Sequence, residues 1–347
     1  MTGTSRRRNY SPWASWMLRL ERTEHCDPMP VDSTPLDLDA LLAWRERCGE
    51  RLSSLLGALP EPVPADLDTL ESVEHEGYRM DKVVFDTEET MSVPSYLLVP
   101  DDRAEPGPAV LAVHGHGAGK AEVCGLVASG SPNGDYAAQL AKRGYVVLAP
   151  DLRCFGERTD WNPPDHYACD TNLVHALMAA WNPLSQNLWD LARSLDVLEA
   201  HPLVDPRRIG VVGLSYGGTM ALFLSAWDQR IAAAVVSGYF SSVAESHRVP
   251  WNMCGSQVLP GMLGRIEHLD LGALVAPRPL LVETGSEDIL FPLAAASDAV
   301  GKLGLLYRQL GADDRLVHDV FDGGHQWHGT LAYPFLVHWL GAPAAAV

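Results

Sequence analysis

One serine, Ser215, lies between two glycines in the stretch GVVGLSYGGTMAL, residues 210–222. The spacing G-x-S-x-G is typical of a sharp turn from a buried strand to a helix, which exposes the serine hydroxyl. Gly213 and Gly217 lack the β-carbons that would collide in such a turn. The valines before Ser215 predict the buried strand, and the residues from Tyr216 onward predict the helix. We therefore predict that Ser215 is a nucleophile.

A serine nucleophile needs a general base, and the base needs a carboxylate that orients it. In LLVETGSEDILFP, Asp288 follows a buried strand, and in VFDGGHQWHG, His325 lies in a glycine-flanked loop. We predict that Asp288 is the carboxylate, because Glu283 should still lie within the strand. We predict that His325 is the base, because Gly323 and Gly324 let the backbone approach closely there. The alternatives are Glu283 and Glu287 for the carboxylate and His328 for the base.

Attack by a serine on a carbonyl group creates an oxyanion, which two preorganised N–H groups should stabilise. One candidate donor is the backbone N–H of Tyr216, directly after the nucleophile, and the other is that of His116 in the loop VHGHGAGK. Because His-x-His pairs can bind zinc, the alternative is a metal site formed by His114, His116, His325 and His328. No acidic ligand accompanies the HGHG stretch, so we predict the backbone role, with no metal and no cofactor.

The elements that must position these residues alternate between short β-rich runs and longer helical segments. Several runs consist almost entirely of Val, Leu and Ala, as expected where helices cover both faces of a parallel sheet. The sequence therefore predicts an α/β fold with a mostly parallel, eight-stranded sheet flanked by helices, in which the first two strands form an antiparallel edge. The predicted strands are residues 82–87, 92–100, 109–115, 145–151, 209–215, 232–238, 279–285 and 316–321.

Residues 1–75 are predicted to be an N-terminal helical extension. Apolar residues recur at helical spacing from Leu38 to Leu59, after the capping signals Ser33, Thr34 and Pro35. Its apolar stripe must be covered, either by the body of the protein or by a second copy in a homo-oligomer. Residues 76–347 would form the catalytic domain, with cap-like insertions near 155–183 and 240–270 that are longer than ordinary connections.

Large side chains in and beside these insertions are candidates for the wall of a substrate pocket. Taken singly, each large aromatic side chain is more often part of the core than in contact with a substrate. The candidates are Trp161, Trp181, Tyr239, Phe240, Trp251 and Met253. The neighbouring Asp151 and Arg153 are predicted to tie loops together, because buried charges are usually paired.

Composition and charge narrow the choice of partners. The 347-residue chain has 26 Lys and Arg against 44 Asp and Glu, a formal net charge of −18, which disfavours nucleic acids and anionic membranes. No apolar run reaches the roughly 20 residues of a membrane span, and no signal-peptide pattern opens the chain, so we predict a cytoplasmic protein. Its six cysteines lack CxxC spacing, which predicts neither a disulfide framework nor a zinc knuckle.

The stretches HGHG, DLRCFGER, VDPRRIGVVGLSYGG, GSEDILFP and DGGH resemble those of the dienelactone-hydrolase-like and acetyl-xylan-esterase-like group of α/β-hydrolases. The resemblance spans about residues 80–345 and implies the α/β-hydrolase fold, with its catalytic residues in the chain order Ser, Asp, His. It implies a triad of Ser215, Asp288 and His325 and an oxyanion hole formed by the N–H groups of His116 and Tyr216.

These observations predict a serine hydrolase that cleaves a small-molecule carboxylic ester through an acyl-enzyme intermediate. One alternative is a peptidase or amidase resembling the prolyl oligopeptidase group, although the N-terminal extension is too short for a β-propeller. The others are an acyltransferase on the same scaffold and a binding protein without catalysis.

Overall fold

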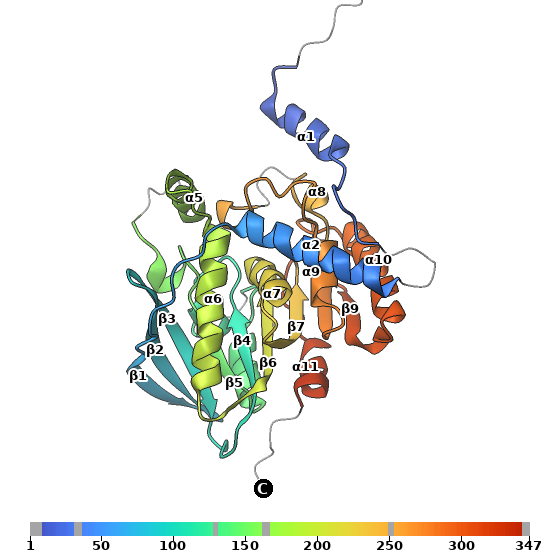
Figure 1. Cartoon of the computed structure of the whole chain (residues 1–347). Helices are drawn as coiled ribbons and strands as arrows, with labels where there is room; N and C mark the ends of the chain where they lie inside the picture. The colour runs from blue at the N-terminus through green and yellow to red at the C-terminus, as the bar shows by residue number, and fades with distance from the viewer. Residues whose placement is uncertain (1–8, 31–36, 128–130, 162–166, 249–252, 342–347) are drawn as a thin grey trace, which may run out of the picture.

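The computed structural model describes residues 9–30, 37–127, 131–161, 167–248 and 253–341 (Figure 1). A single nine-stranded sheet in the order β1-β2-β3-β5-β4-β6-β7-β8-β9 runs through these residues. The strands are β1 (Asp68–His75), β2 (Tyr78–Glu88), β3 (Met91–Pro100), β4 (Gly107–Val113), β5 (Val146–Pro150), β6 (Val204–Leu214), β7 (Ile231–Ser237), β8 (Leu280–Gly285) and β9 (Leu316–Phe321).

Strands β1, β2, β3 and β5 pair antiparallel, and β5, β4, β6, β7, β8 and β9 pair parallel. This arrangement confirms the predicted α/β-hydrolase fold and its antiparallel edge. The prediction of eight strands is wrong, because β1 adds a ninth within the part expected to be helical. Its residues are almost all exposed and pair only with β2, so no alternating apolar pattern marks it in the sequence.

Helices cover both faces of the sheet. They are α1 (Pro12–Arg22), α2 (Leu38–Leu56), α3 (Lys120–Val123), α4 (Tyr136–Lys142), α5 (Ala168–Met178), α6 (Pro183–Ala200), α7 (Tyr216–Trp227), α8 (Val243–Ser246), α9 (His268–Val275), α10 (Leu293–Gln309) and α11 (Ala332–Leu340). Short 3-10 helices lie at η1 (Gly156–Arg158), η2 (Gly255–Gln257) and η3 (Asp313–Arg315). None of the helices in the described ranges is long and apolar enough to cross a membrane.

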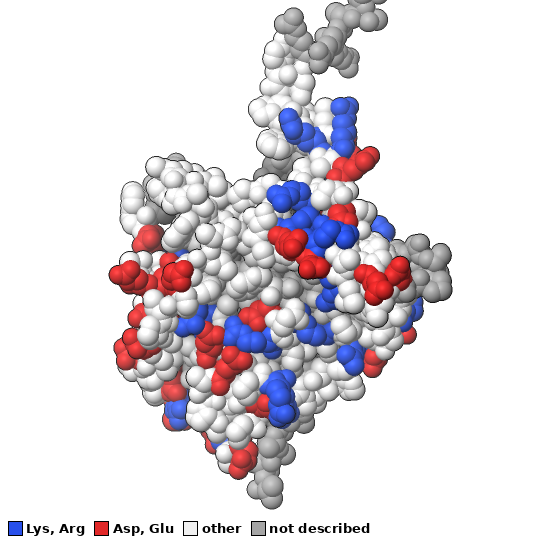
Figure 2. Space-filling model, viewed as in Figure 1, with Lys and Arg blue, Asp and Glu red and all other residues white. Residues whose placement is uncertain are grey.

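The two faces of the sheet have separate hydrophobic cores. Helices α2, α6, α7, α9 and α10 share one core with side chains such as Leu111, Val211 and Val282, and α3, α4 and α11 share the other. On the face shown in Figure 2, basic side chains are interspersed with acidic ones rather than gathered into a single patch. This mixed surface offers no continuous basic strip on that face for a polyanion.

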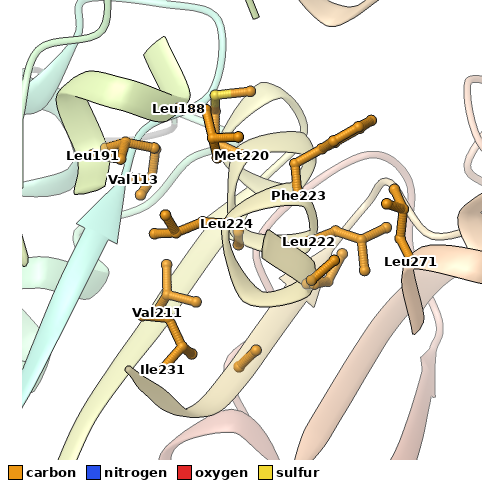
Figure 3. Close-up of a cluster of buried hydrophobic side chains, with 14 of the residues drawn as sticks. Val113, Leu188, Leu191, Val211, Met220, Leu222, Phe223, Leu224, Ile231 and Leu271 are labelled. Atoms are coloured by element: carbon orange, nitrogen blue, oxygen red, sulfur yellow. The ribbon is translucent and has the colours of Figure 1, made fainter. Parts of the chain in front are cut away.

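Helix α7, which carries the residues after Ser215, is buried along almost its whole length, from Tyr216 to Ala226. Figure 3 shows Met220 and Leu224 of this helix beside Leu188 and Leu191 of α6. A helix that is apolar on every side is stable only when other elements enclose it. Helices α6 and α9 and the sheet supply that enclosure, so the start of α7 is held firmly against the strand ends.

The N-terminal extension packs on the body of its own chain through α2. Trp44 is only 1% exposed, and its indole N–H donates to the carbonyl oxygen of Asp27 at 2.9 Å. The guanidinium of Arg45 donates to the carbonyl oxygens of Leu274 and Ala276, at the end of α9. Helix α1 has no buried residue and projects from the body in Figure 1. Helix α2 is therefore part of the main core, whereas α1 is not.

Replacing Trp44 with alanine should lower the free energy of unfolding by about 3–5 kcal/mol, because it leaves a large cavity in the core. The matched control is Leu42→Ala on the opposite side of α2, where the side chain is 55% exposed and the expected change is within about 0.5 kcal/mol. Urea unfolding of both variants measures the difference. If Trp44→Ala lowered the free energy of unfolding as little as Leu42→Ala, α2 would not contribute to the core through its buried face.

Candidate active site

Ser215 lies in a strained turn between β6 and α7. Its backbone has φ 59° and ψ −116°, a left-handed region that a non-glycine residue rarely adopts. A β-carbon at Gly213 would collide with the backbone of Gly217, and one at Gly217 would collide with the carbonyl oxygen of Val113. The N–H of Ser215 donates to the carbonyl oxygen of Ser237 at 2.9 Å, which ties the turn to β7. The serine therefore lies beyond the carboxyl ends of the parallel strands, as its spacing predicts.

Asp288 and His325 come from the loops that follow β8 and β9, and their side chains meet. Nδ1 of His325 lies 2.8 Å from Oδ2 of Asp288, whose side chain is buried. The other carboxylate oxygen, Oδ1, accepts hydrogen bonds from the backbone N–H groups of Leu290 and Phe291 at 2.8 and 3.1 Å. Both oxygens of Asp288 are thus used, and the imidazole is fixed through Nδ1.

The second ring nitrogen of His325, Nε2, is buried and has no hydrogen-bond partner within the described part of the chain. His325 and Ser215 line the same cavity. Phe291 stacks on the imidazole with ring centroids 5.7 Å apart, and a β-carbon at Gly238 would lie 3.0 Å from its Cε1 atom. No sequence pattern marks Gly238 for this role, because it depends on a neighbour 87 positions away. The packing leaves Nε2 as the only ring nitrogen available for chemistry.

The alternative residues are engaged elsewhere. Nδ1 of His328 lies 2.9 Å from Asp319, and its Nε2 lies 3.0 Å from the hydroxyl of Thr330. Glu283 is buried within β8 and accepts a hydrogen bond from the N–H of Gly329 at 2.7 Å. Burial raises the pKa of Glu283 above its usual value. Glu287 is exposed. None of the three alternative residues lines the cavity that contains Ser215.

The loop that carries His116 is held by a buried polar network. Asn133 accepts from the N–H of Gly115 at 3.0 Å and donates to the carbonyl oxygen of His116 at 3.2 Å. Glu122 accepts from the N–H of Ala118 and from the Asn133 amide, each at 3.0 Å. Nothing in the sequence singles out Asn133 or Glu122, because neither belongs to the HGHG stretch and their contacts with its backbone arise only in the folded chain. The network fixes the backbone on which the predicted donor lies.

The zinc site considered from the sequence does not form. Both ring nitrogens of His114 are used, since Nδ1 lies 2.7 Å from the carbonyl oxygen of Gly115 and Nε2 accepts from the N–H of Leu152 at 2.9 Å. His116 lies beside the cavity, and burial lowers its pKa to about 4, with a smaller contribution from the nearby His325. The His116 imidazole is therefore neutral at neutral pH. Tyr216, as the first residue of α7, has a backbone N–H with no acceptor inside the helix.

A cavity of about 580 Å³ opens at Ser215. Of the six pocket candidates from the sequence, Met253 lines it and Trp251 lies outside the described residues. Tyr239 and Phe240 are instead buried in the core. Trp161 and Trp181 are 87% and 42% exposed, and neither lines this cavity. The lining is His116, Pro132, Asn133, Tyr167, Asp170, Leu214, Ser215, Met253, Cys254, Leu290, Phe291 and His325.

Asp151 and Arg153 form ion pairs, as the sequence predicts. Asp151 accepts from the ammonium of Lys120 at 2.5 Å, and Arg153 pairs with Asp190 at 2.8 Å and with Glu88. All five side chains are buried, and neither Asp151 nor Arg153 lines the cavity. These pairs join the loop after β5 to β2, α3 and α6.

The model of the Abhydrolase family matches residues 24–302 of this chain. The chain belongs to the Abhydrolase family. It is 28% identical over 305 residues to the protein YtaP of Bacillus subtilis (strain 168), a match that covers 84% of this chain and 98% of YtaP.

Solved structures show the same fold for this Abhydrolase family member. A Bacteroides fragilis protein assigned as an acetyl xylan esterase superimposes with a TM-score of 0.76 at 20% identity, covering 93% of this chain and 84% of that one. A glucuronoyl esterase from Solibacter usitatus gives a TM-score of 0.66 at 15% identity, covering 91% and 99%.

A fluorophosphonate should label Ser215 in the wild type and leave Ser215→Ala unlabelled. His325→Ala should slow labelling by on the order of 10² to 10⁴, because the buried Nε2 can no longer take the serine proton. The matched control is His328→Ala, whose ring nitrogens are occupied by Asp319 and Thr330 and which should label at close to the wild-type rate. Intact-protein mass spectrometry follows the rates. Rapid labelling of His325→Ala with slow labelling of His328→Ala would show that the general base is His328 and not His325.

Proposed function

We propose that this chain is a serine hydrolase that cleaves carboxylic esters of small molecules through an acyl-enzyme intermediate. The observation that carries the proposal is the His325–Asp288 pair, 2.8 Å apart, in which His325 lines the same cavity as Ser215 and keeps its buried Nε2 without a hydrogen-bond partner among the described residues. A nucleophile, a base that takes its proton and a carboxylate that orients the base are the parts that acyl transfer by a serine requires. The esterase names of the two similar structures support the choice of an ester as the substrate.

In the first half of the proposed reaction, Oγ of Ser215 attacks the ester carbonyl carbon while Nε2 of His325 takes the hydroxyl proton. Asp288 stabilises the imidazolium through Nδ1, which holds the tautomer with Nε2 as acceptor. The carbon–oxygen bond to the alcohol then breaks as Nε2 returns the proton to the leaving alkoxide. An acyl group bound to Oγ of Ser215 is left.

In the second half, a water molecule gives a proton to the same nitrogen and attacks the acyl carbon. Collapse of this second tetrahedral intermediate returns the proton to Oγ of Ser215 and releases the carboxylic acid. The negative charge in each intermediate would be held by the backbone N–H groups of His116 and Tyr216. The Asn133–Glu122 network supports this role for His116, since it fixes the loop before substrate binds.

The charge of the cavity favours a neutral ester. Its lining contains neither Lys nor Arg among the described residues, and its one charged side chain is the carboxylate of Asp170. The segments 162–166 and 249–252, which adjoin Tyr167 and Met253 in the sequence, also contain no Lys or Arg. An anionic substrate would meet no cationic side chain there, so an uncharged acyl group and alcohol fit the site best.

Activity on nitrophenyl esters of increasing acyl length, measured beside aminoacyl-nitroanilides, tests the reaction class. We expect cleavage of the esters, and we expect Ser215→Ala, His325→Ala and the double variant to lose kcat by a similar factor, on the order of 10⁴ to 10⁶. Asp288→Asn should lose somewhat less, because the imidazole survives without its orienting charge.

The matched control for Asp288→Asn is Glu287→Gln, which removes an exposed carboxylate one residue away and should change kcat by less than about tenfold. Circular dichroism verifies that each variant is folded. Cleavage of the anilides alone would identify a peptidase or amidase and reject the esterase proposal.

A further inference from the structure

Three cysteines that are far apart in the sequence lie together beside the cavity. Nε2 of His116 is 3.2 Å from Sγ of Cys254, and one ligand atom each from His116, Cys169 and Cys254 lie within 4.8 Å of one another. The thiol of Cys154 interacts with that of Cys169. None of the three cysteines, Cys154, Cys169 and Cys254, forms a disulfide bond.

We propose that His116, Cys169 and Cys254 form a binding site for Zn²⁺ or a similarly soft divalent cation. Zinc favours a ligand set of one imidazole and two thiolates. Hard cations such as Mg²⁺ and Ca²⁺ prefer oxygen ligands instead. From zinc–ligand bonds of about 2.0 to 2.3 Å, tetrahedral ligands lie roughly 3.4–3.8 Å apart. The observed spacing is close enough that side-chain movements on the order of 1 Å would bring all three onto one ion.

The surroundings hold the ligands in place before an ion arrives. Cys169 and Cys254 are buried, and His116 packs against the rings of Phe155, Tyr167 and Tyr216 at centroid distances of 5.3, 5.7 and 5.3 Å. Burial excludes water from two of the three ligands, and the aromatic contacts limit rotation of the third. Such preorganisation lowers the cost of binding.

Two ligands of the proposed site, His116 and Cys254, also line the cavity, so a bound ion would lie at the cavity wall, with a fourth coordination position that these three residues leave open. That position would take water or, after a rotation, the thiol of Cys154. Binding transfers one proton from each coordinating thiol to solvent and involves no change of oxidation state. The ion would link three segments: the loop after β4, helix α5 and the start of η2.

One consequence concerns activity and rests on the proposed function. An ion at this position and its fourth ligand would narrow the cavity beside Ser215 and fix the imidazole of His116. Zinc should therefore inhibit ester cleavage reversibly, and a chelator should restore it.

The site itself is tested without any activity, by titrating the reduced full-length protein with Cd²⁺ as a spectroscopic probe. We expect an ultraviolet cadmium–thiolate charge-transfer band that saturates at one ion per chain. Cys169→Ser and Cys254→Ser should each weaken binding by more than about 100-fold, since they remove direct ligands. The matched controls Cys26→Ser, at an exposed position, and Cys48→Ser, buried in α2, should retain the band. Loss of the band in a control but not in the cluster variants would overturn the proposal.

A second measurement needs no variant and so does not depend on how well a buried substitution folds. Zinc-edge X-ray absorption of the zinc-loaded wild type should show a coordination shell with nitrogen and two sulfur atoms, or three sulfurs if Cys154 joins. A shell of oxygen and nitrogen alone would reject the site. A cadmium band with no ester cleavage by the metal-free protein would support the site and count against the proposed function, so the two failures are distinguishable.

Discussion

The close approach of α7 to the ends of β4 and β6 is the constraint on which the site depends. No side chain separates these elements at the turn, because β-carbons at Gly213 and Gly217 would collide with backbone atoms. With the helix this near, Ser215 takes a positive φ, and its N–H reaches the carbonyl oxygen of Ser237. The enclosed, apolar body of α7 stabilises a turn that would otherwise cost on the order of 1–3 kcal/mol in backbone strain.

Hydrogen bonds and ion pairs between buried polar groups fix the conformations of the loops around this turn. The Asn133–Glu122 network holds the loop of His116, and the ion pairs of Asp151 and Arg153 hold the loop after β5. Each of these groups has a partner, as buried charges require. Glu283 holds the loop of His325, because its carboxylate accepts a hydrogen bond from the backbone N–H of Gly329. The base is therefore positioned from two sides, by Asp288 at its ring and by Glu283 at its loop.

The parts of this protein with local sequence patterns were predictable, and the parts that depend on distant contacts were not. Ser215, Asp288 and His325 each stand beside turn glycines or at a strand end, so their spacing predicts their placement at one edge of the sheet. Strand β1 lacks an apolar face, which hides it from any periodicity. Aromatic residue type does not distinguish a pocket wall from a core, and so Tyr239 and Phe240 were wrong as pocket candidates. The same limit hid the cysteine cluster, since only the folded chain brings Cys169 beside Cys254.

The docking of α2 onto α9 has a consequence for the order in which this chain folds. Arg45 reaches carbonyl oxygens that lie 229 and 231 positions later in the sequence. During synthesis from the N-terminus, the buried face of α2 is made long before the helix that covers it, so Trp44 and its apolar neighbours stay uncovered until α9 has emerged. Contacts of such long sequence separation form late, because the entropy of closing the loop must be overcome first. Helix α2 is thus synthesised early but docks late, and the growing chain carries its exposed apolar stripe for most of its synthesis.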